Sequence, residues 1–463
     1  MNSENDYIIT VVKHLYNNNL LYTMLSEKNK VKQIIFEDDK KFDLYDEISF
    51  DLQSKDNGTR LKKEGVIENK EYNNIINNII SNYLKKMNNV NLHFENETLE
   101  KITENMLPDL HEVAIKIIKN IITGTPIIIR FHNDADGCSG ALALYKSIHI
   151  FSKEQNISNQ PIFWRINKSI AYNIDALYED KLMINKYKSI EKPLLLIVDF
   201  GTSEESEDAL RSKRDFDIIM LDHHPIYESF PITSINNYIN PWRYKGDSNY
   251  TAGFLAGVVA QLISDTNLSA LMNASLIGDH SIYSNLNNKH AEKISIVLDY
   301  ITGKNTNFNI EKTFEYIENE KELDQLFRHS TSLFEEALAS ALKHIKRYKE
   351  TNKIQIFVLD FNYVERVEDD FPLPGRFSSK LHDKIEELNG PNLTIVHYGS
   401  YISFRMSNIL ANNINMLKKL EELKNSNKYV YSAGGHNAAA SIRVDREHVK
   451  SILKEVLELF GIN

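Results

Sequence analysis

The sequence predicts an α/β protein, because short apolar runs and helix-like stretches alternate along most of the chain. Between about residues 113 and 310, each apolar run is bounded by a turn or an acidic cluster and is followed by a helical pattern. Buried strands that alternate with helices are typical of βαβ units around a parallel sheet. A chain of 463 residues is also too long for one compact core. We therefore expect two or three domains.

Changes in composition along the chain define four parts. We predict an N-terminal α+β extension of unknown role, a parallel-sheet domain, a connector helix that is charged on one side, and a smaller α/β domain. In that order, these parts cover residues 1–112, 113–322, 323–350 and 351–463.

The apolar pattern also predicts the elements of each part. In the extension we expect helices over residues 8–25 and 72–87 and a weak strand pair near 34–36 and 48–52. In the parallel-sheet domain we expect strands at 126–131, 193–200 and 216–221 and helices at 140–151 and 253–264. In the last part we expect strands at 354–360, 393–397, 401–405 and 439–444 and helices at 378–388 and 445–459.

Charge and cysteine content exclude several classes of protein. The single cysteine, Cys138, rules out an internal disulfide and a zinc site built from thiolates. The net charge of −10 argues against a surface that coats duplex DNA non-specifically, although bound divalent cations can bring positive charge to a phosphate. The N-terminus carries no secretory pattern, and no apolar stretch is long enough to span a bilayer. We therefore expect a cytoplasmic protein without a membrane partner.

Metal-ligand residue types follow each of the three strands expected in the parallel-sheet domain. In open α/β sheets, ligands bind beyond the carboxyl ends of the strands, so these side chains should meet at one edge. A further acidic residue follows an apolar helix-like run and completes the predicted cluster. The residues are His132, Asp134 and Asp136 after the first strand, Asp199 after the second, Asp222, His223 and His224 after the third, and Asp279 after the helix.

This set of side chains suits divalent metal ions. Carboxylates and imidazoles without thiolate are ligands for manganese, magnesium or zinc. Four carboxylates packed together without a cation would repel one another, and some would stay protonated. Taken singly, each Asp is explained as a helix cap or turn residue, and the two histidines as a buried hydrogen-bonded pair. The joint pattern favours two divalent cations and metal-assisted phosphoester hydrolysis.

The motifs, in this order, resemble those of the DHH phosphoesterase superfamily. Asp222-His223-His224 is similar to the DHH triplet, and the HNDADG, VDFG and GDH segments are similar to the family's other metal motifs. The GGHNAA segment that begins at Gly434 resembles the GGH motif of the DHH-associated domain. The HNDADG form is closer to archaeal RecJ-like nucleases, including the GINS-associated nuclease, than to the small oligoribonucleases. The resemblance covers about residues 113–463 and implies a DHH catalytic domain over 113–322 and a DHH-associated substrate-binding domain over 351–463.

The resemblance also implies roles for the metal-site residues. Asp134 and Asp136 would each serve a different ion, and Asp199 would bridge both. His223 and Asp279 would complete the shell of the second ion, and the nucleophile would be metal-bound hydroxide. The ions would be Mn²⁺, with Mg²⁺ as the alternative. His132 occupies a different position from the histidine of many members, where this chain has Arg130. The sequence leaves open whether His132 ligates the first ion or only supports the site.

The remaining roles concern substrate and supporting residues. The resemblance implies that His224 contacts the scissile phosphate and that Asp222 orients the neighbouring imidazole. His280 would support the site without ligating a metal. From the last domain, the resemblance implies substrate contacts through Ser403, Arg405, Gly434, Gly435 and His436.

Three functions are compatible with these residues. The leading hypothesis is an exonuclease for single-stranded DNA or RNA, as the RecJ-like motif form implies. The second is an enzyme for short oligoribonucleotides or small nucleotides, which the acidic charge favours. The third is a scaffold in the replisome that binds GINS without catalysis. Because degenerate relatives lose metal ligands, the intact ligand set argues for an enzyme, and an enzyme can also bind GINS.

Overall fold

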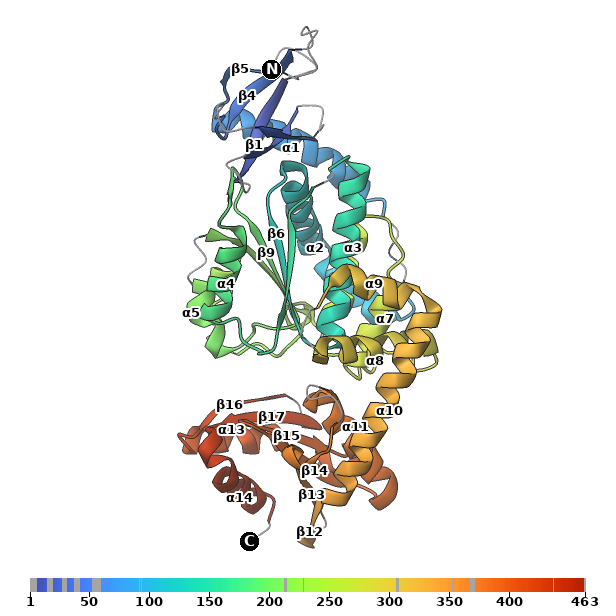
Figure 1. Cartoon of the computed structure of the whole chain (residues 1–463). Helices are drawn as coiled ribbons and strands as arrows, with labels where there is room; N and C mark the ends of the chain where they lie inside the picture. The colour runs from blue at the N-terminus through green and yellow to red at the C-terminus, as the bar shows by residue number, and fades with distance from the viewer. Residues whose placement is uncertain are drawn as a thin grey trace. The chain divides into compact units, whose positions relative to one another are not determined.

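The computed structural model describes two compact units of the chain (Figure 1). One unit contains Met1–Leu298 with Phe308–Glu315, and the other contains Asp299–Asn307 with Tyr316–Asn463. Among the described residues, no helix combines the length and the apolar run that a bilayer crossing demands. The description covers all residues except 1–5, 15–19, 27–30, 37–41, 52–59, 91, 93, 158, 212–214, 228, 305–307, 352–353, 367–370, 436 and 462–463.

The N-terminal part forms an antiparallel sheet with the strand order β3-β2-β1-β4-β5, and β8 also pairs with β1. Its strands are β1 (Asp6–His14), β2 (Leu20–Leu25), β3 (Val31–Phe36), β4 (Asp46–Asp51), β5 (Arg60–Val66) and β8 (Tyr187–Ser189).

The helix predicted over residues 8–25 is therefore wrong. The segment holds two antiparallel strands, with Val12 opposite Tyr22. Its first half, Ile8 to Val12, consists of β-branched residues, whose restricted side chains fit a pleated sheet better than a helix. The two predicted strands near residues 34 and 48 are present as β3 and β4, but they do not pair with each other, because β2 and β1 lie between them. Leu52 lies outside the described residues.

The central sheet is parallel throughout, as predicted, with the order β11-β10-β9-β6-β7. The side chains of β9 are all buried, which explains why its sequence is a continuous apolar run rather than an alternating one. Because β9 lies between β6 and β10, the residues that follow these three strands emerge next to one another. The strands are β6 (Ile127–His132), β7 (Ile162–Asn167), β9 (Leu194–Val198), β10 (Asp217–Leu221) and β11 (Asn237–Ile239).

Helices cover both faces of the central sheet, with α2 and α3 on one side and α4 and α5 on the other (Figure 1). Helices α6 and α7 pack against α3. The predicted helices at 72–87 and 140–151 fall within α1 and α3, and the one at 253–264 corresponds to α6 but extends one residue beyond its end. The bounds are α1 (Asn69–Met87), α2 (Glu97–Thr123), α3 (Ala135–Glu154), α4 (Ile174–Ile184), α5 (Glu207–Arg211), α6 (Ala252–Ile263), α7 (Ser269–Gly278), α8 (Lys289–Lys304) and α9 (Ile310–Glu318).

The C-terminal unit contains a mixed sheet with the order β12-β13-β14-β15-β17-β16, in which only β13 and β14 pair in parallel. Helices α13 and α14 contribute to an apolar core with this sheet, and α10 and α11 contribute to a second one. The bounds are α10 (Glu320–His344), β12 (Lys346–Thr351), β13 (Ile354–Asp360), α11 (Pro374–Asn389), β14 (Asn392–Tyr398), β15 (Tyr401–Met406), α12 (Asn408–Ala411), α13 (Met416–Ser426), β16 (Val430–Gly435), β17 (Ala439–Val444) and α14 (Val449–Leu459).

Two helix boundaries predicted in this half are wrong. The helix expected over 323–350 ends at His344, because Ile345 is extended and the next residues pair with β13 as β12. The helix expected from residue 445 begins at Val449, after a 3-10 turn that the Asp445 side chain caps. The four predicted strands are present as β13, β14, β15 and β17, and the helix predicted at 378–388 lies within α11. The elements β12, α12, α13 and β16 were not predicted.

Candidate metal centre

Four separated segments bring acidic and imidazole side chains to the carboxyl edge of the parallel sheet. Each position follows from the end of a strand or helix, where the backbone turns and the side chain is directed beyond the sheet. His132 ends β6, Asp134 caps α3, Asp136 lies in the first turn of α3, Asp199 follows β9, Asp222, His223 and His224 follow β10, and Asp279 caps the end of α7.

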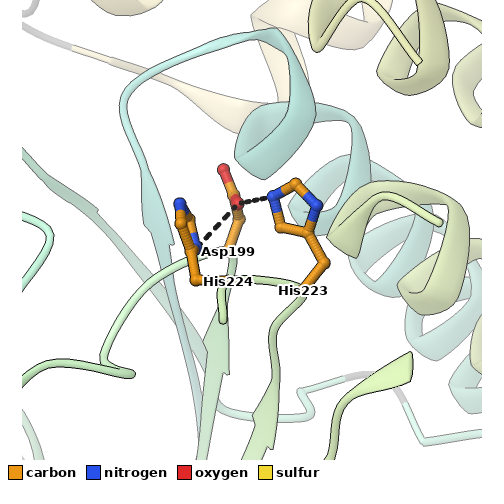
Figure 2. Close-up of side chains that lie close together, drawn as sticks. All are labelled: Asp199, His223 and His224. Atoms are coloured by element: carbon orange, nitrogen blue, oxygen red, sulfur yellow. Dashed lines mark ion pairs between the residues drawn. The ribbon is translucent and has the colours of Figure 1, made fainter. Parts of the chain in front are cut away.

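Asp199 lies between two sets of potential ligands. Its Oδ2 atom is 3.5 Å from Nδ1 of His132, and its Oδ1 atom is 3.2 Å from Nε2 of His223. Figure 2 shows the Asp199 carboxylate between the rings of His223 and His224, and Nδ1 of His224 lies 4.0 Å from Oδ1. The two oxygens of this one carboxylate therefore face different partners.

The ligand atoms form three overlapping groups, and within each group they lie within 4.8 Å of one another. One group joins His132, Asp134 and Asp199, and another joins Asp136, His223 and Asp279. The third joins Asp199 with His223 and His224. The groups define two neighbouring candidate cation positions, one at His132 and Asp134 and one at Asp136, His223 and Asp279. Asp199 shares a group with the first pair and another with His223.

Asp136 is held by the start of α6. Its carboxylate accepts hydrogen bonds from the backbone N–H groups of Ala252 (3.0 Å) and Gly253 (2.7 Å) and from Oγ of Ser275 (2.6 Å). A Cβ atom at Gly253 would lie 2.5 Å from the backbone oxygen of Asp136, so only glycine allows this approach. These contacts fix the orientation of a carboxylate whose residue is only 2% exposed.

His223 is oriented by a carbonyl from a later loop. Its Nδ1 atom lies 2.7 Å from the backbone oxygen of Ser248, which can only accept a hydrogen bond, so Nδ1 carries a proton. The other ring nitrogen, Nε2, is thereby directed at Asp199 and at carboxylate oxygens of Asp136 (3.7 Å) and Asp279 (3.6 Å). A neutral imidazole held in this tautomer presents a lone pair to the cluster, as a metal ligand does.

Asp222 lies behind the two histidines, fully buried. Its Oδ1 atom is 2.7 Å from Nδ1 of His224, and its Oδ2 atom accepts a hydrogen bond of 2.5 Å from the hydroxyl of Thr202. Burial acts to raise the pKa of this carboxyl. The charge of His224 and the hydrogen bond to it outweigh burial and lower the pKa to about 2. Asp222 is therefore a charged partner that orients His224.

The electrostatics of the metal-free cluster show that it lacks positive charge. Burial and the charge of Asp199 raise the pKa of Asp136 well above the ordinary value for an aspartate. Burial acts to lower the pKa of both His132 and His223, but the neighbouring carboxylates outweigh it and raise each pKa well above the ordinary value. Protons thus compensate the carboxylates, as a bound cation would do.

Asp199 shows two further features of a metal ligand. Its Oδ1 atom is buried and makes no hydrogen bond when Nε2 of His223, 3.2 Å away, carries no proton. Such an oxygen is costly unless a cation or a donor satisfies it. The backbone of Asp199 has φ = 66°, a conformation that aspartate adopts at some energetic cost and that is common at functional sites. Together with the oxygen and imidazole donors, these features fit divalent cations.

Other predicted residues lie elsewhere. Ser403 and Arg405 are on β15, and Gly434 and Gly435 are on β16, all within the C-terminal unit. The Arg405 guanidinium donates hydrogen bonds to Oγ of Ser379 (2.8 Å) and to the backbone oxygen of Gly375 (3.2 Å) at the start of α11. His436 lies outside the described residues. His280 is exposed with φ = 52°, one residue beyond Asp279.

Several residues that support the site were not predicted from the sequence. Ser248, Thr202 and Ser275 are distant from their partners along the chain, and nothing local marks them. One signal was present for Gly253, because Thr251 is a helix cap followed by two small residues, a sequence that permits a close approach to a helix N-terminus.

Comparison with known proteins agrees with this geometry. Residues 126–278 match the family described as DHH family, N-terminal domain. These residues form a DHH-family phosphoesterase domain that carries a candidate His/Asp metal site. An uncharacterized protein of Methanocaldococcus jannaschii is 23% identical over 74% of this chain. The chain spans about half, 52%, of the length of that relative.

Two solved structures share the fold. A DHH domain from a protein described as a member of a ribosomal protein family has a TM-score of 0.69 and 22% identity, over 86% of this chain and all (100%) of the other. RecJ from Thermus thermophilus in complex with Mn²⁺ has a TM-score of 0.50 and 15% identity, over 77% of this chain and 55% of the other. These identities establish a common fold.

Proposed function

We propose that this chain is a metal-dependent phosphodiesterase that degrades single-stranded DNA or RNA as an exonuclease of the RecJ-like type. The observation that carries the proposal is the Asp199 carboxylate, which lies between two sets of ligands with one buried oxygen unsatisfied. The RecJ whose fold this chain shares was solved with Mn²⁺, which supports manganese as the cofactor here.

Seven side chains would hold two divalent cations and the substrate phosphate. His132 and Asp134 would hold one ion, and Asp136, His223 and Asp279 would hold the other. Asp199 would serve both ions, because it shares one group with His132 and Asp134 and another with His223. When bound, two such cations supply Lewis acidity and lower the pKa of water, so that it can attack a phosphodiester at neutral pH. The His224 side chain, 40% exposed and held by Asp222, would donate a hydrogen bond to a phosphate oxygen.

The C-terminal unit would contribute contacts to the rest of the substrate. Arg405 offers planar N–H donors that suit phosphate, and it is held by the start of α11. Ser403 lies on the same strand, two residues before it. Gly434 and Gly435 lie on β16, which pairs with β17 in the same sheet. Because they lack side chains, their backbone is accessible to a phosphate or a base. His436 is proposed as a further contact on the basis of its motif.

A second candidate is an enzyme for short oligoribonucleotides or small nucleotides. The net charge of −10 favours it, because long strands require many phosphate contacts from basic side chains. Under this alternative, the same metal centre would act on dinucleotides.

A substrate-length series separates the two. Single strands of two to about thirty nucleotides, labelled at the 5′ or 3′ end, are incubated with the protein and Mn²⁺. We expect processive release of mononucleotides from long strands, and the labelled end gives the polarity. Hydrolysis of dinucleotides alone would favour the second candidate.

The matched variants are Asp199→Asn, which keeps the shape of the ligand, and Asp265→Asn, an exposed aspartate between α6 and α7. The first should lose the activity and the second should keep it. Equal activity of both variants would remove the metal centre from the proposal.

A further inference from the structure

Three large apolar side chains are exposed on segments that adjoin the metal centre. Trp242 is 43% exposed, Ile282 is 74% exposed and Leu286 is 70% exposed. Ile282 and Leu286 belong to the loop that follows the ligand Asp279, and Trp242 belongs to the 3-10 helix η5 (Pro241–Tyr244), which follows β11. Exposed apolar side chains on segments next to a polar site are candidates for contact with a ligand.

Trp242 is fixed directly to the metal-ligand segment. Its indole N–H donates to the backbone oxygen of His223 (3.2 Å) and to Oγ of Ser248 (3.1 Å). Its backbone N–H donates to Oδ1 of Asn240 (3.1 Å), and the Asn240 amide donates to the backbone oxygen of His224 (3.0 Å). The polar edge of the ring is therefore anchored to the two histidines' backbone, while much of its apolar surface stays exposed.

The loop that carries Ile282 is joined to the same short segment. The Ser281 hydroxyl donates to the backbone oxygen of Asn249 (2.6 Å), and the backbone N–H of Ile282 donates to Oδ1 of Asn249 (3.1 Å). Because Ser248 binds the Trp242 indole and Asn249 binds the Ile282 loop, both exposed side chains are positioned by two consecutive residues. Both segments are therefore held rigidly next to the ligands His223 and Asp279.

We propose that Trp242, assisted by Ile282, stacks against the base of the nucleotide whose phosphate is bound at the metal centre. This inference rests on the proposed function, and it assigns a base-binding role to residues outside the metal ligands. A phosphate at the cluster is joined through one sugar to a base, and an aromatic face anchored to the backbone of a metal ligand is available to it. Stacking on an aromatic ring tolerates every base, as a non-specific exonuclease requires.

Charge and chemistry favour a nucleobase as the occupant. The cluster itself is acidic and recognises phosphate only through cations, so it provides no contact that distinguishes a nucleotide from inorganic phosphate. The Trp242 ring, with its N–H already bound inside the protein, offers only its apolar faces and edges to a ligand. A flat aromatic base satisfies such a surface, and its own polar edge stays in solvent.

The first test compares intact strands with strands that carry an abasic residue at the end where digestion starts. For wild type, removal of this base should lower kcat/KM by about tenfold, the usual effect of one stacked base. Trp242→Ala should lower kcat/KM about tenfold on the intact strand and cause little further loss on the abasic strand. Trp242→Phe, which keeps a ring, should retain discrimination between the two strands.

Two other variants keep the test independent of folding. Ile282→Ala removes a side chain that is 74% exposed and should weaken discrimination by a few-fold. Tyr178→Ala, at an aromatic residue 62% exposed on α4, is the matched control and should change nothing. If Trp242→Ala lowers kcat/KM equally on intact and abasic strands, Trp242 only supports His223 and the stacking proposal is overturned.

A binding measurement separates this inference from the proposed activity. The chain has two tryptophans, and Trp164→Phe leaves Trp242 as the sole tryptophan emitter. A slowly hydrolysed phosphorothioate strand with Mn²⁺ should quench this emission, and a fully abasic strand of equal length should not. Quenching without hydrolysis of any strand would refute the activity and support the base site. Hydrolysis without base-dependent quenching would refute the base site.

Discussion

Two buried clusters of charged residues lie along strand β6, and they are balanced in opposite ways. Arg130, 2% exposed, donates to both carboxylate oxygens of the fully buried Asp180 on α4, with distances of 2.8 to 3.1 Å. The hydroxyl of Tyr172 donates to Asp180 as well. Arg130 also donates to the amide oxygen of Asn167, to the carboxylate of the exposed Glu179 and to the backbone oxygen of Ala176. The protein itself supplies both the positive and the negative charge of this cluster. We call such a cluster closed.

The candidate metal centre begins two residues further along β6, at His132. We call this cluster open, because the protein supplies no permanent positive charge to its carboxylates among the described residues. In the part of the chain that the structure describes, the ion pairs of Asp136, Asp199 and Asp279 are all with histidine. An imidazole carries a positive charge only when it is protonated, whereas Arg130 is always charged. The comparison separates a buried cluster whose charges the protein neutralises itself from one that is a candidate site for cations.

The largest expected effect is on activity, from a substitution in the candidate metal centre that should leave the protein folded. Asp199→Asn removes the carboxylate that forms one group with His132 and Asp134 and another with His223. We therefore expect kcat to fall by about a thousandfold, or ~4 kcal/mol in the barrier. In the metal-free protein, burial acts to raise the pKa of Asp199, but His132 and His223 outweigh it and hold this pKa well below its ordinary value. The variant should therefore lose some stability, but less than the loss of one partner of a buried ion pair would cost. Steady-state kinetics and urea unfolding measure the two quantities. A large loss of stability would place Asp199 among the structural residues.

The closed cluster should give the reverse result. Arg130→Met leaves Asp180 buried without its cation, so we expect the free energy of unfolding to fall by about 3 kcal/mol or more. Urea unfolding checks this value.

Lys181→Met provides the control for Arg130→Met. Lys181 pairs with Asp215 at 2.7 Å, but both side chains are about half exposed (41% and 51%), so its loss should cost under about 1 kcal/mol. An equal loss in the free energy of unfolding for Arg130→Met and Lys181→Met would show that burial does not make the Arg130–Asp180 pair more important than the exposed one.

Addition of metal should stabilise the open cluster in a pH-dependent way. Mn²⁺ at about 100 times its Kd should raise the free energy of unfolding by ~2.7 kcal/mol. In the metal-free protein, His132 and His223 have raised pKa values and hold protons that the metal must displace. Stabilisation by a fixed Mn²⁺ concentration should therefore decline as pH falls through these pKa values. Thermal unfolding with and without EDTA, at several pH values, measures it, and a pH-independent shift would contradict the assigned ligands.

A smaller effect on activity is expected from substitution of Asp222, which lies behind His223 and His224. Asp222→Asn keeps the shape of the residue but removes the charge that faces His224, so we expect activity to fall by about tenfold. The variant should bind Mn²⁺ with nearly the affinity of wild type, since Asp222 belongs to none of the ligand groups. Kinetics and calorimetric titration separate the two effects. Loss of metal binding would make Asp222 a ligand.

The sequence predicted which acidic and imidazole side chains come together, because most of them lie directly after buried strands. Asp134, Asp199 and His223 are recognisable from their local context, and parallel strands bring such residues together. The supporting residues were missed because the chain returns to them from a distance: Ser248 lies 25 residues after His223, and Asp180 lies 50 after Arg130. The strands of residues 8–25 were mistaken for a helix because apolar residues fit both periodicities over so short a stretch.

The most direct test of the central claim is the location of metal in crystals grown with Mn²⁺. Anomalous scattering should show two peaks about 3.5–4 Å apart, on either side of the Asp199 carboxylate. One peak should lie near His132 and Asp134, and the other near Asp136, His223 and Asp279. A single peak elsewhere on the chain, or no peak beside Asp199 at saturating Mn²⁺, would contradict the account.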